Sequence, residues 1–371
     1  MNAVKNFNSE YVLNNGVTVK NRLVVAPMTH WGAVAENGRI TDTERAFLKD
    51  RATGFGMFIT AATLVSEEGR AFLGEPFVVS KADLLDLKER ADIIKAQGAK
   101  AILQIHHGGW NLLQPPAEGL QTVAPSANEE HNAVEADEKT IQHLIAAFAN
   151  ATALAMEAGY DGVEVHGANN YLLQQFYSAE SNQREDAWGG SREKRMRFPL
   201  AVLDACIAEK EKAGNKDFII GYRFSPEEPG EKGLTMEDTF ALLDALMERP
   251  LQYLHVSLHD YYAKARRGAD DTRDRMELLH AYINGRLPLI GVGNLLTGEA
   301  VEKAFAEGNA EFIALGKAVL VNPLMGELLT EGRYAEIETE LDPARKEEYR
   351  FPETLWTLNM QKLDFLPRVK A

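Results

Sequence analysis

Short apolar runs alternate with amphipathic stretches along most of the chain. The runs are rich in β-branched residues and short enough for buried strands, and the stretches after them carry apolar residues at helical spacing. The eight apolar runs begin at Leu23, Met57, Lys100, Asp161, Phe218, Tyr253, Leu287 and Glu311. A closed parallel barrel has eight strand-then-helix units, so the pattern predicts an α/β fold of the (β/α)8 TIM-barrel class.

Residues that commonly cap helices stand at the start of the amphipathic stretches. They are Thr41 or Asp42, Ser80 with Asp83, Asp137, Ser191, Thr235, Asp274 and Thr297. Their short side chains carry oxygen atoms that accept hydrogen bonds from the free N–H groups of a first helical turn. We therefore expect a helix to begin at each of these positions.

The two ends of the chain add to the barrel. The dipeptide Asn15–Gly16 lies between two alternating runs and predicts a tight β-hairpin that caps one end of the barrel. We predict a single domain over residues 1–371, with the barrel at about 20–330 and a peripheral helical extension at about 331–371. An open doubly wound sheet is the competing fold, but it needs a glycine-rich turn where the first strand ends in A-P-M-T, Ala26–Thr29.

Composition narrows the class of function. The net charge is −15 and the pI is near 5.2, whereas nucleic acids and anionic membranes are bound by clustered lysine and arginine. One cysteine, Cys206, excludes a disulfide framework and a cysteine-ligated cluster within the chain. No apolar run approaches the roughly 20 residues of a membrane span. These features indicate a cytoplasmic protein with a small-molecule substrate, and they leave monomer and homo-oligomer both open.

The fourth apolar run stops abruptly in polar residues. In the segment Asp161–Phe176 the strand ends at His166, and Asn169 and Tyr171 follow shortly after it. The carboxyl ends of barrel strands form the active-site face, so these three side chains are expected to face a ligand. For each residue alone a packed or hydrogen-bonded core position is the plainer interpretation, and the three together favour a binding site.

Other strand ends carry residues that are candidates for binding an anion. The last two strands end in G-V-G-N and A-L-G-K, so Gly293, Asn294, Gly316 and Lys317 are candidates for a phosphate site, with tight turns as the alternative. Arg223 ends a mainly apolar strand, and a buried guanidinium needs an acceptor or an anion nearby. A structural ion pair inside the barrel is its alternative role.

Together these motifs resemble a known family. The segment V-E-V-H-G-A-N-N-Y-L-L-Q-Q-F, followed by S-N-Q-R-E-D-A-W-G-G-S, is similar to the signature of the old yellow enzyme family of FMN-dependent ene-reductases. The likeness extends to A-P-M-T, A-T, Q-I-H-H-G-G, Y-R-F-S, G-V-G-N and L-G-K at other strand ends, and it spans about Tyr11 to Pro323. No cysteine cluster is present, so the resemblance is to the short, single-domain form.

The resemblance implies a non-covalently bound FMN, reduced by NADH or NADPH and reoxidised by an α,β-unsaturated carbonyl compound such as an enone or enal. Residues implied to hold the FMN are Pro27, Met28, Thr29 and Ala62 along the ring, Gln104 and Arg223 at its pyrimidine edge, and Gly293, Asn294, Gly316 and Lys317 at its phosphate. His166 and Asn169 are implied to donate hydrogen bonds to the substrate oxygen, and Tyr171 to protonate the α-carbon.

Two positions depart from the family pattern, and two other functions stay open at this point. Asn170 stands where the family often has glycine, and Lys317 where many members have arginine. One alternative is a barrel lyase or isomerase acting on a phosphorylated substrate. The other is a metal-dependent barrel hydrolase using the histidines His106, His107, His166, His255 or His259. The loops Trp110–Asn128 and His259–Arg273 are expected at the rim of the site and carry no recognisable motif.

Overall fold

A closed barrel of parallel strands forms the centre of the protein. The computed structural model describes residues 6–35, 38–113, 118–363 and 366–369, so the predicted rim loop at 110–128 and the C-terminal extension lie partly outside the described residues. The barrel strands are β3 (Leu23–Val25), β4 (Met57–Ile59), β6 (Lys100–His106), β9 (Gly162–Gly167), β10 (Ile219–Phe224), β11 (Tyr253–Val256), β12 (Leu289–Val292) and β13 (Phe312–Leu315). Each pairs in parallel with the next, and β13 pairs with β3, which closes the ring. The predicted (β/α)8 class is confirmed.

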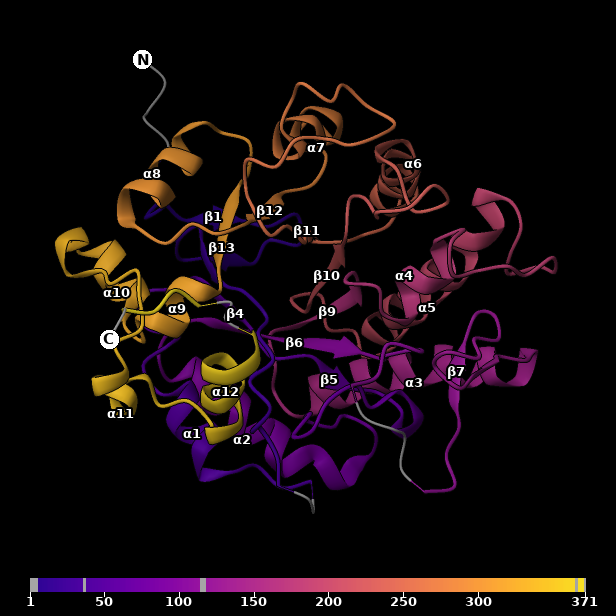
Figure 1. The fold of residues 1–371 in the computed structure, drawn as a ribbon, viewed down its shortest axis with the longest axis horizontal. Coiled ribbons are helices and arrows are strands. Elements are labelled where there is room, and N and C mark those ends of the chain that lie inside the picture. Colours follow the sequence, from indigo (N-terminus) through magenta and orange to yellow (C-terminus); the bar gives the residue numbers. More distant parts are fainter. Residues whose placement is uncertain (1–5, 36–37, 114–117, 364–365, 370–371) are drawn as a thin grey trace.

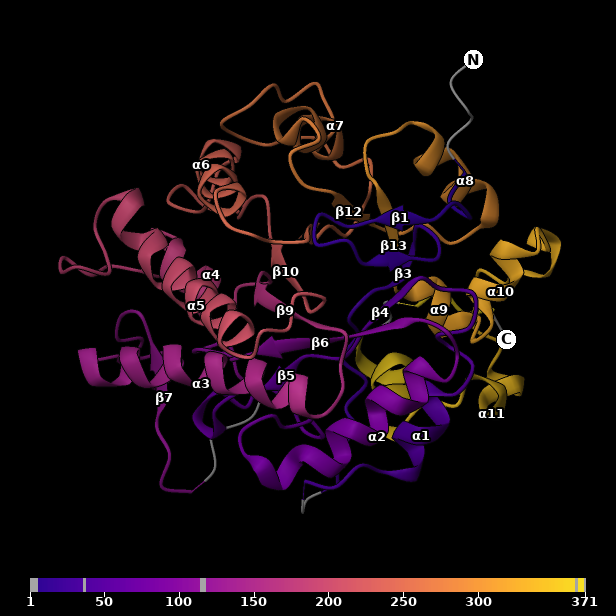
Figure 2. The same cartoon turned by 180° about the vertical axis from the view of Figure 1, so that it is seen from behind.

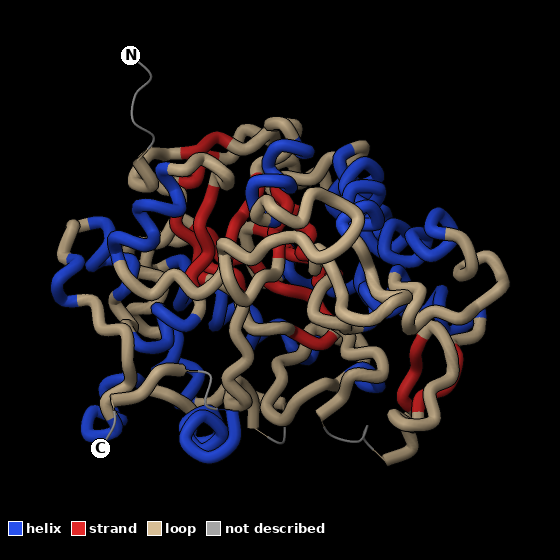
Figure 3. Tube along the Cα trace, turned by 45° about the horizontal axis from the view of Figure 1, so that its top comes forward, coloured by secondary structure: helices blue, strands red, loops and turns tan. Residues whose placement is uncertain are grey.

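Helices surround the strands, as Figure 3 shows in blue around red. Those that follow the barrel strands are α1 (Asp42–Leu48), α2 (Leu84–Lys95), α3 (Glu138–Glu157), α5 (Arg192–Lys212), α6 (Met236–Met247), α7 (Arg275–Ile283), α8 (Gly298–Ala306), α9 (Lys317–Val321) and α10 (Met325–Thr330). The predicted starts are confirmed, since Thr41, Asp137 and Thr297 accept hydrogen bonds from N–H groups of their first turns. At Ser80 the capping box opens a short 3-10 turn, Lys81–Asp83, which leads into α2.

A hairpin seals the amino-terminal end of the barrel. Strands β1 (Tyr11–Val12) and β2 (Thr18–Val19) pair antiparallel across the predicted Asn15–Gly16 turn, where Gly16 has φ +86°. Leu13 and Val19 are buried in one cluster with apolar side chains from the barrel interior. The hairpin lies on the face seen in Figure 2, and helices α11 (Lys346–Tyr349) and α12 (Glu353–Leu358) lie on the opposite face, seen in Figure 1.

The barrel interior changes character along its axis. Near the hairpin it is filled by apolar side chains such as Val24, Met57 and Ile219, all fully buried. Each such side chain contributes roughly 1.5–3 kcal/mol of favourable burial. Toward the carboxyl ends of the strands the interior residues become polar or charged. The strands therefore supply a sealed apolar base and a polar opening.

The C-terminal extension packs against the outside of the barrel. It contains the 3-10 turns Tyr334–Glu336 and Pro343–Arg345, helices α11 and α12, and a π-helical turn, Asn359–Leu363. The guanidinium of Arg51, which is fully buried, donates to the backbone oxygens of Phe47 and Tyr349. Arg350 forms an ion pair with Asp50 at 3.0 Å. The extension is helical, as predicted, and Tyr349 and Leu355 are buried in the outer core.

Two features have no counterpart in the sequence pattern. They are helix α4 (Leu172–Tyr177), directly after the fourth strand, and a two-stranded ribbon outside the barrel formed by β7 (Thr122–Ala124) and β8 (Ala133–Glu135). The short strand β5 (Thr63–Leu64) lies within the predicted run that begins at Met57 and pairs with β6. None of the helices within the described ranges combines the length and the apolar character that crossing a membrane requires.

Candidate active site

A buried carboxylate organises the polar end of the barrel. Glu164, on β9, accepts a hydrogen bond from Gln104 Nε2 at 2.7 Å and contacts His255 Nδ1 at 2.9 Å, and all three side chains are buried. Arg223, on β10, is the strand neighbour of His166 and His255 and is 8% exposed. Its Nε has no hydrogen-bond partner among the described residues. The arrangement holds Gln104 and Arg223 ready for a bound group.

The ionisable groups of this network shift the pKa values of their neighbours. Burial alone would raise the pKa of Glu164, but His255, Arg223 and Gln104 outweigh burial and lower it. Burial lowers the pKa of Arg223 despite the nearby Glu164. Glu164 is therefore an anion that partly balances the buried guanidinium.

His166 and Tyr171 meet at the end of β9. Their ring centroids are 5.3 Å apart at 65°, and the Tyr171 ring also lies edge-on to His106 at 4.5 Å. Burial, followed by the neighbouring His106, holds the pKa of His166 well below its usual value. His166 is therefore neutral at pH 7 and can donate one N–H, while its Nδ1 has no partner among the described residues.

Tyr171 is placed by the turn that leads into α4. Asn169 and Asn170 both adopt left-handed backbone conformations, with φ +58° and +60°. Asparagine tolerates this conformation better than most residues, so the turn forms with Asn170 at a position where the family often has glycine. Burial, and then the charge of Glu75, raise the pKa of Tyr171 to about 12. The phenol is therefore fully protonated at neutral pH.

The Asn169 side chain, expected to face the substrate, forms a hydrogen bond with Ser257. Its side chain is exposed, and its Oδ1 accepts a hydrogen bond from Ser257 at 2.7 Å. Its backbone N–H donates to Ser225 Oγ at 2.9 Å. The bond from Ser257 occupies the amide oxygen and leaves Nδ2 as the donor.

His106, a second buried histidine, packs against Tyr171 and is held in place by Glu75. Glu75 contacts His106 Nδ1 at 2.8 Å, and its other oxygen accepts the N–H groups of Ala71 and Phe72. Phe72 stacks on the His106 ring at 5.7 Å and meets the Tyr171 ring edge-on at 6.1 Å. The sequence predicts His106 only as a strand-end histidine and gives no sign of Glu75, because their contact joins the end of β6 to a separate loop with no shared motif.

The loop after β3 is held in place by a buried ion-pair network. His30 contacts Glu44 at 2.8 Å, and Arg90 contacts the same carboxylate at 3.3 Å, with all three side chains buried. This network anchors the half-buried strip Pro27–Thr29. Ala62 lies elsewhere, in a small apolar cluster with Ala71 and Phe72 against which Tyr171 packs.

The loops after β12 and β13 have the geometry of a cradle. Gly293 has φ +146°, and a Cβ there would lie 2.3 Å from the backbone nitrogen of Tyr261, so only glycine fits. Asn294 follows it, exposed and with φ +51°. Gly316 precedes α9, whose first residue is Lys317. The Lys317 ammonium forms no hydrogen bond or ion pair that the described part of the chain records.

A cavity of about 1050 Å³ opens over the carboxyl ends of β9, β10 and β11. Of the residues predicted from the sequence, Pro27, Asn169 and Arg223 line it. His166 and Tyr171 lie beside it through their contacts with the same turn, whereas Gly293, Asn294, Gly316 and Lys317 are outside its lining. The structure thus brings most predicted groups to one end of the barrel and separates the phosphate candidates from the cavity.

Comparison with known proteins agrees with this geometry. Residues 12–336 match the sequence profile of the NADH:flavin oxidoreductase / NADH oxidase family. A probable NADH-dependent flavin oxidoreductase of Bacillus subtilis is 42% identical over 360 residues, which make up 96% of each chain. Morphinone reductase, a solved structure, superposes with a TM-score of 0.76 at 25% identity, over 92% of this chain and 93% of that one.

The chain belongs to the old yellow enzyme family. It is also 38% identical to NADH:fumarate oxidoreductase of Klebsiella pneumoniae, covering 94% of this chain but only 38% of that longer protein. The family assignment makes the protein an oxidoreductase that uses FMN and a nicotinamide reductant. It therefore favours the flavin enzyme over the lyase, isomerase and hydrolase alternatives.

The residues present fit the FMN of an old yellow enzyme. Arg223 offers a buried N–H that lacks a partner among the described residues, which suits the negative pyrimidine edge of a reduced flavin. The Gly293 turn leaves backbone room that any side chain would fill, and Lys317 offers a cation on the neighbouring loop. Lysine keeps the charge of the family's arginine but lacks its two-pronged geometry.

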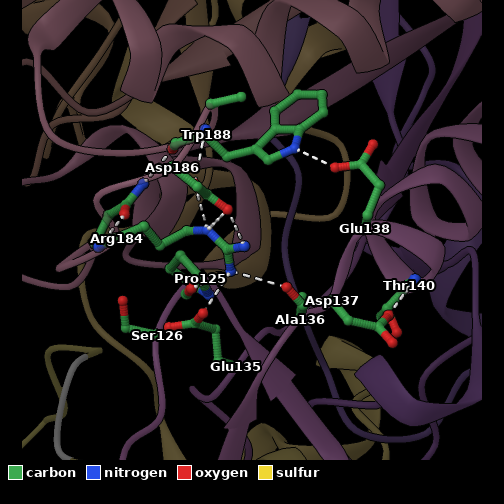
Figure 4. Close-up of polar contacts among 12 residues, drawn as sticks. Pro125, Ser126, Glu135, Ala136, Asp137, Glu138, Thr140, Arg184, Asp186 and Trp188 are labelled. Carbon is green, nitrogen blue, oxygen red and sulfur yellow. Dashed lines mark hydrogen bonds and ion pairs between the residues drawn. The ribbon is translucent and has the colours of Figure 1, made fainter.

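The second half of the family signature has a structural task. Arg184 is 7% exposed, and its guanidinium donates to the backbone oxygens of Pro125 and Ala136, both at 2.8 Å, and to Asp186 (Figure 4). Pro125 and Ala136 directly follow β7 and β8. The Ser181–Ser191 segment thus clamps the ribbon to the barrel. The sequence identifies this segment only by its likeness to the family signature. The clamp itself was not predictable, because it depends on contacts between residues distant in the chain.

Proposed function

We propose that the protein reduces the activated C=C bond of α,β-unsaturated carbonyl compounds at the expense of NADH or NADPH. The observation that carries the proposal is the grouping of His166 and Tyr171, with rings 5.3 Å apart, beside Arg223 at the open end of the barrel. A hydrogen-bond donor, a proton donor and a buried cation are the three groups that such a reduction uses. FMN, when bound, would supply the hydride chemistry that links the nicotinamide to the β-carbon of the alkene.

His166 and Asn169 hold the carbonyl oxygen of the substrate. Addition of hydride at the β-carbon moves negative charge onto this oxygen, and N–H donors held in place beside it stabilise that charge. A single such donor is typically worth about 3 kcal/mol. The neutral state of His166 and the orientation of the Asn169 amide by Ser257 support these roles.

Tyr171 supplies the proton that completes the product. Its O–H bond breaks as a C–H bond forms at the α-carbon, and the electron pair of the enolate makes that bond. Water then returns a proton to the phenolate. The raised pKa of Tyr171 suits this task, because the group stays protonated until a basic carbanion forms.

The cofactor is held by residues from the carboxyl ends of six strands, β3, β4, β6, β10, β12 and β13. We assign Pro27, Met28, Thr29 and Ala62 to the ring, Gln104 and Arg223 to its pyrimidine edge, and Gly293, Asn294, Gly316 and Lys317 to its phosphate. Support comes from the network that fixes Gln104 and Arg223 around Glu164, and from the cradle at Gly293.

The proposal is tested by separating the two half-reactions. The FMN-loaded protein is reduced without oxygen by NADH, and 2-cyclohexenone is then added while the flavin absorbance is followed. We expect the absorbance to return with the enone and not with saturated cyclohexanone as the control. A reduced protein that stays reduced in the presence of enones and enals contradicts the proposed substrate class.

A further inference from the structure

The cavity extends well beyond the strand-end residues that the proposed function uses. Its volume is about 1050 Å³, the scale of a site for a drug-sized or larger ligand. The residues that the proposed function uses, Pro27, Asn169 and Arg223, lie at its inner end, at the barrel mouth. The outer part is lined by two loops, one after β6 and the other after β11. The outer part therefore offers room for a portion of the reductant that lies away from the reacting atoms.

One side of the outer cavity is an aromatic stack. The rings of Trp110 and His131 lie 4.3 Å apart at 23°, and both are half-buried. The backbone N–H of Trp110 donates to Gln175 Oε1 at 3.2 Å. His131 lies between β7 and β8, the ribbon that Arg184 clamps. The stack is thus attached to the barrel from both sides and offers a fixed aromatic surface.

The other side carries a cation on a braced loop. The backbone N–H of Arg266 lies 3.0 and 3.1 Å from the two oxygens of Glu227, whose side chain is 1% exposed. Glu227 also accepts the N–H of Arg267 at 2.8 Å and forms an ion pair with Arg275. The Arg266 side chain itself is exposed and makes no hydrogen bond or ion pair with the residues that the structure describes.

We propose that the outer cavity binds the ADP-ribose half of NADH. The adenine packs on the stack of Trp110 and His131, and the Arg266 guanidinium binds the diphosphate. Purines stack well on aromatic side chains, and a guanidinium matches phosphate oxygens in shape and charge. The assignment rests on the proposed function only in placing the nicotinamide ring at the inner end of the cavity.

The charges around this site favour NADH over NADPH. Three exposed carboxylates, Glu130, Glu180 and Asp260, line the cavity with Arg266. A 2′-phosphate would add about −1.5 to −2 charges beside them, with Arg266 already engaged by the diphosphate. Like charges repel, so the dinucleotide without the extra phosphate is preferred.

The test compares a whole and a truncated reductant. Reduction of the FMN-loaded enzyme is followed by stopped flow with NADH and with 1-benzyl-1,4-dihydronicotinamide, which has no phosphate and no adenine. We expect Arg266→Ala and Trp110→Ala each to raise the Kd for NADH about tenfold, with less than about a twofold change in the limiting rate. The Kd for the truncated donor stays unchanged. Arg266→Lys recovers part of the NADH affinity.

Lys264→Ala is the matched control. It removes the same charge from the same loop, but Lys264 is outside the cavity lining. We expect it to change neither reductant's Kd, and the wild-type enzyme to show a higher kcat/KM with NADH than with NADPH. The proposal is overturned if Arg266→Ala leaves NADH binding unchanged, weakens the truncated donor equally, or matches Lys264→Ala. An enzyme that is reduced by NADH but passes no electrons to enones would contradict the proposed function and leave this test intact.

Discussion

The floor and the rim of the cavity are built in different ways. At the floor, Arg223 lines the cavity and His166 lies beside it. Both side chains are buried at strand ends, next to the network around Glu164. The rim consists of loop residues such as Trp110 and Arg266, which are half-buried or exposed and whose loops are braced through their backbones. Rigid, desolvated groups suit transition-state stabilisation, whereas exposed groups on braced loops suit recognition of a ligand's distant parts.

This difference predicts separate consequences for mutation. Changes at the floor are expected to alter the rate of a chemical step, and changes at the rim to alter affinity. The loss of activity should be greatest where a proton is transferred.

Tyr171→Phe removes that proton donor. Oxidation of the reduced enzyme by an enone is expected to slow by about 10²–10⁴-fold, while reduction by NADH changes little. Stopped-flow measurement of both half-reactions checks this. Tyr177→Phe, at the last residue of the helix that Tyr171 precedes and outside the cavity lining, is the control and leaves both rates unchanged. Equal losses in the two half-reactions would contradict the role of Tyr171.

His166→Ala removes a donor to the substrate oxygen. Reoxidation by an enone is expected to slow about 10²–10³-fold, and phenolic ligands are expected to bind more weakly. Ligand affinity is measured from the perturbation of the flavin spectrum. His143→Ala, whose side chain is 63% exposed, serves as control. Unchanged affinity for phenols in His166→Ala would place the oxygen elsewhere.

Arg184→Ala tests how the rim is attached. It leaves two backbone oxygens, those of Pro125 and Ala136, without their buried partner, so unfolding free energy should fall by about 2–4 kcal/mol. Hydrogen exchange in the β7–β8 ribbon should rise as well. Arg197→Ala, an exposed arginine of α5, is expected to change stability by less than about 0.5 kcal/mol. Unaltered exchange in the ribbon would show that the clamp is dispensable.

Lys317→Ala is expected to weaken FMN binding without altering either chemical step of the loaded enzyme. Loss of this cation should raise the Kd about tenfold, equivalent to roughly 1.4 kcal/mol. Fluorescence titration of the apoprotein with FMN measures the change. Full retention of affinity would move the phosphate away from the β12 and β13 loops.

The rate of the proton-transfer step should not depend on pH near neutrality. Since the pKa of Tyr171 is raised to about 12, its acidic form persists as pH rises through the ordinary tyrosine value of about 10. Single-turnover reoxidation by an enone should therefore keep its rate from pH 7 to about 10. A fall centred near the ordinary value would contradict the shift.

The floor was largely predictable from the sequence and the rim was not. Strand ends follow from periodicity, so the apolar runs alone place His166, Tyr171 and Arg223 at one end of a barrel. The orientation of Asn169 toward Ser257 was not predictable, because it depends on a loop from another strand. The loops Trp110–Asn128 and His259–Arg273 show no period or motif. The stacking of Trp110 on His131, which lies beyond the first loop, and the bracing of Arg266 on Glu227 arise only from tertiary contacts.

The Arg184 clamp has a consequence for how the protein can diversify. The arginine holds the β7–β8 ribbon through the backbone oxygens of Pro125 and Ala136, which are present whatever side chains the ribbon carries. Two side chains add to the attachment: Ser126 Oγ accepts the N–H of Gln183 at 2.9 Å, and Glu135 forms an ion pair with Arg184 at 3.5 Å. The sequence between Ser126 and Glu135 can therefore change without loosening the attachment. Libraries randomised in that segment, including His131, should retain folding at a high rate while altering which reductants the enzyme accepts.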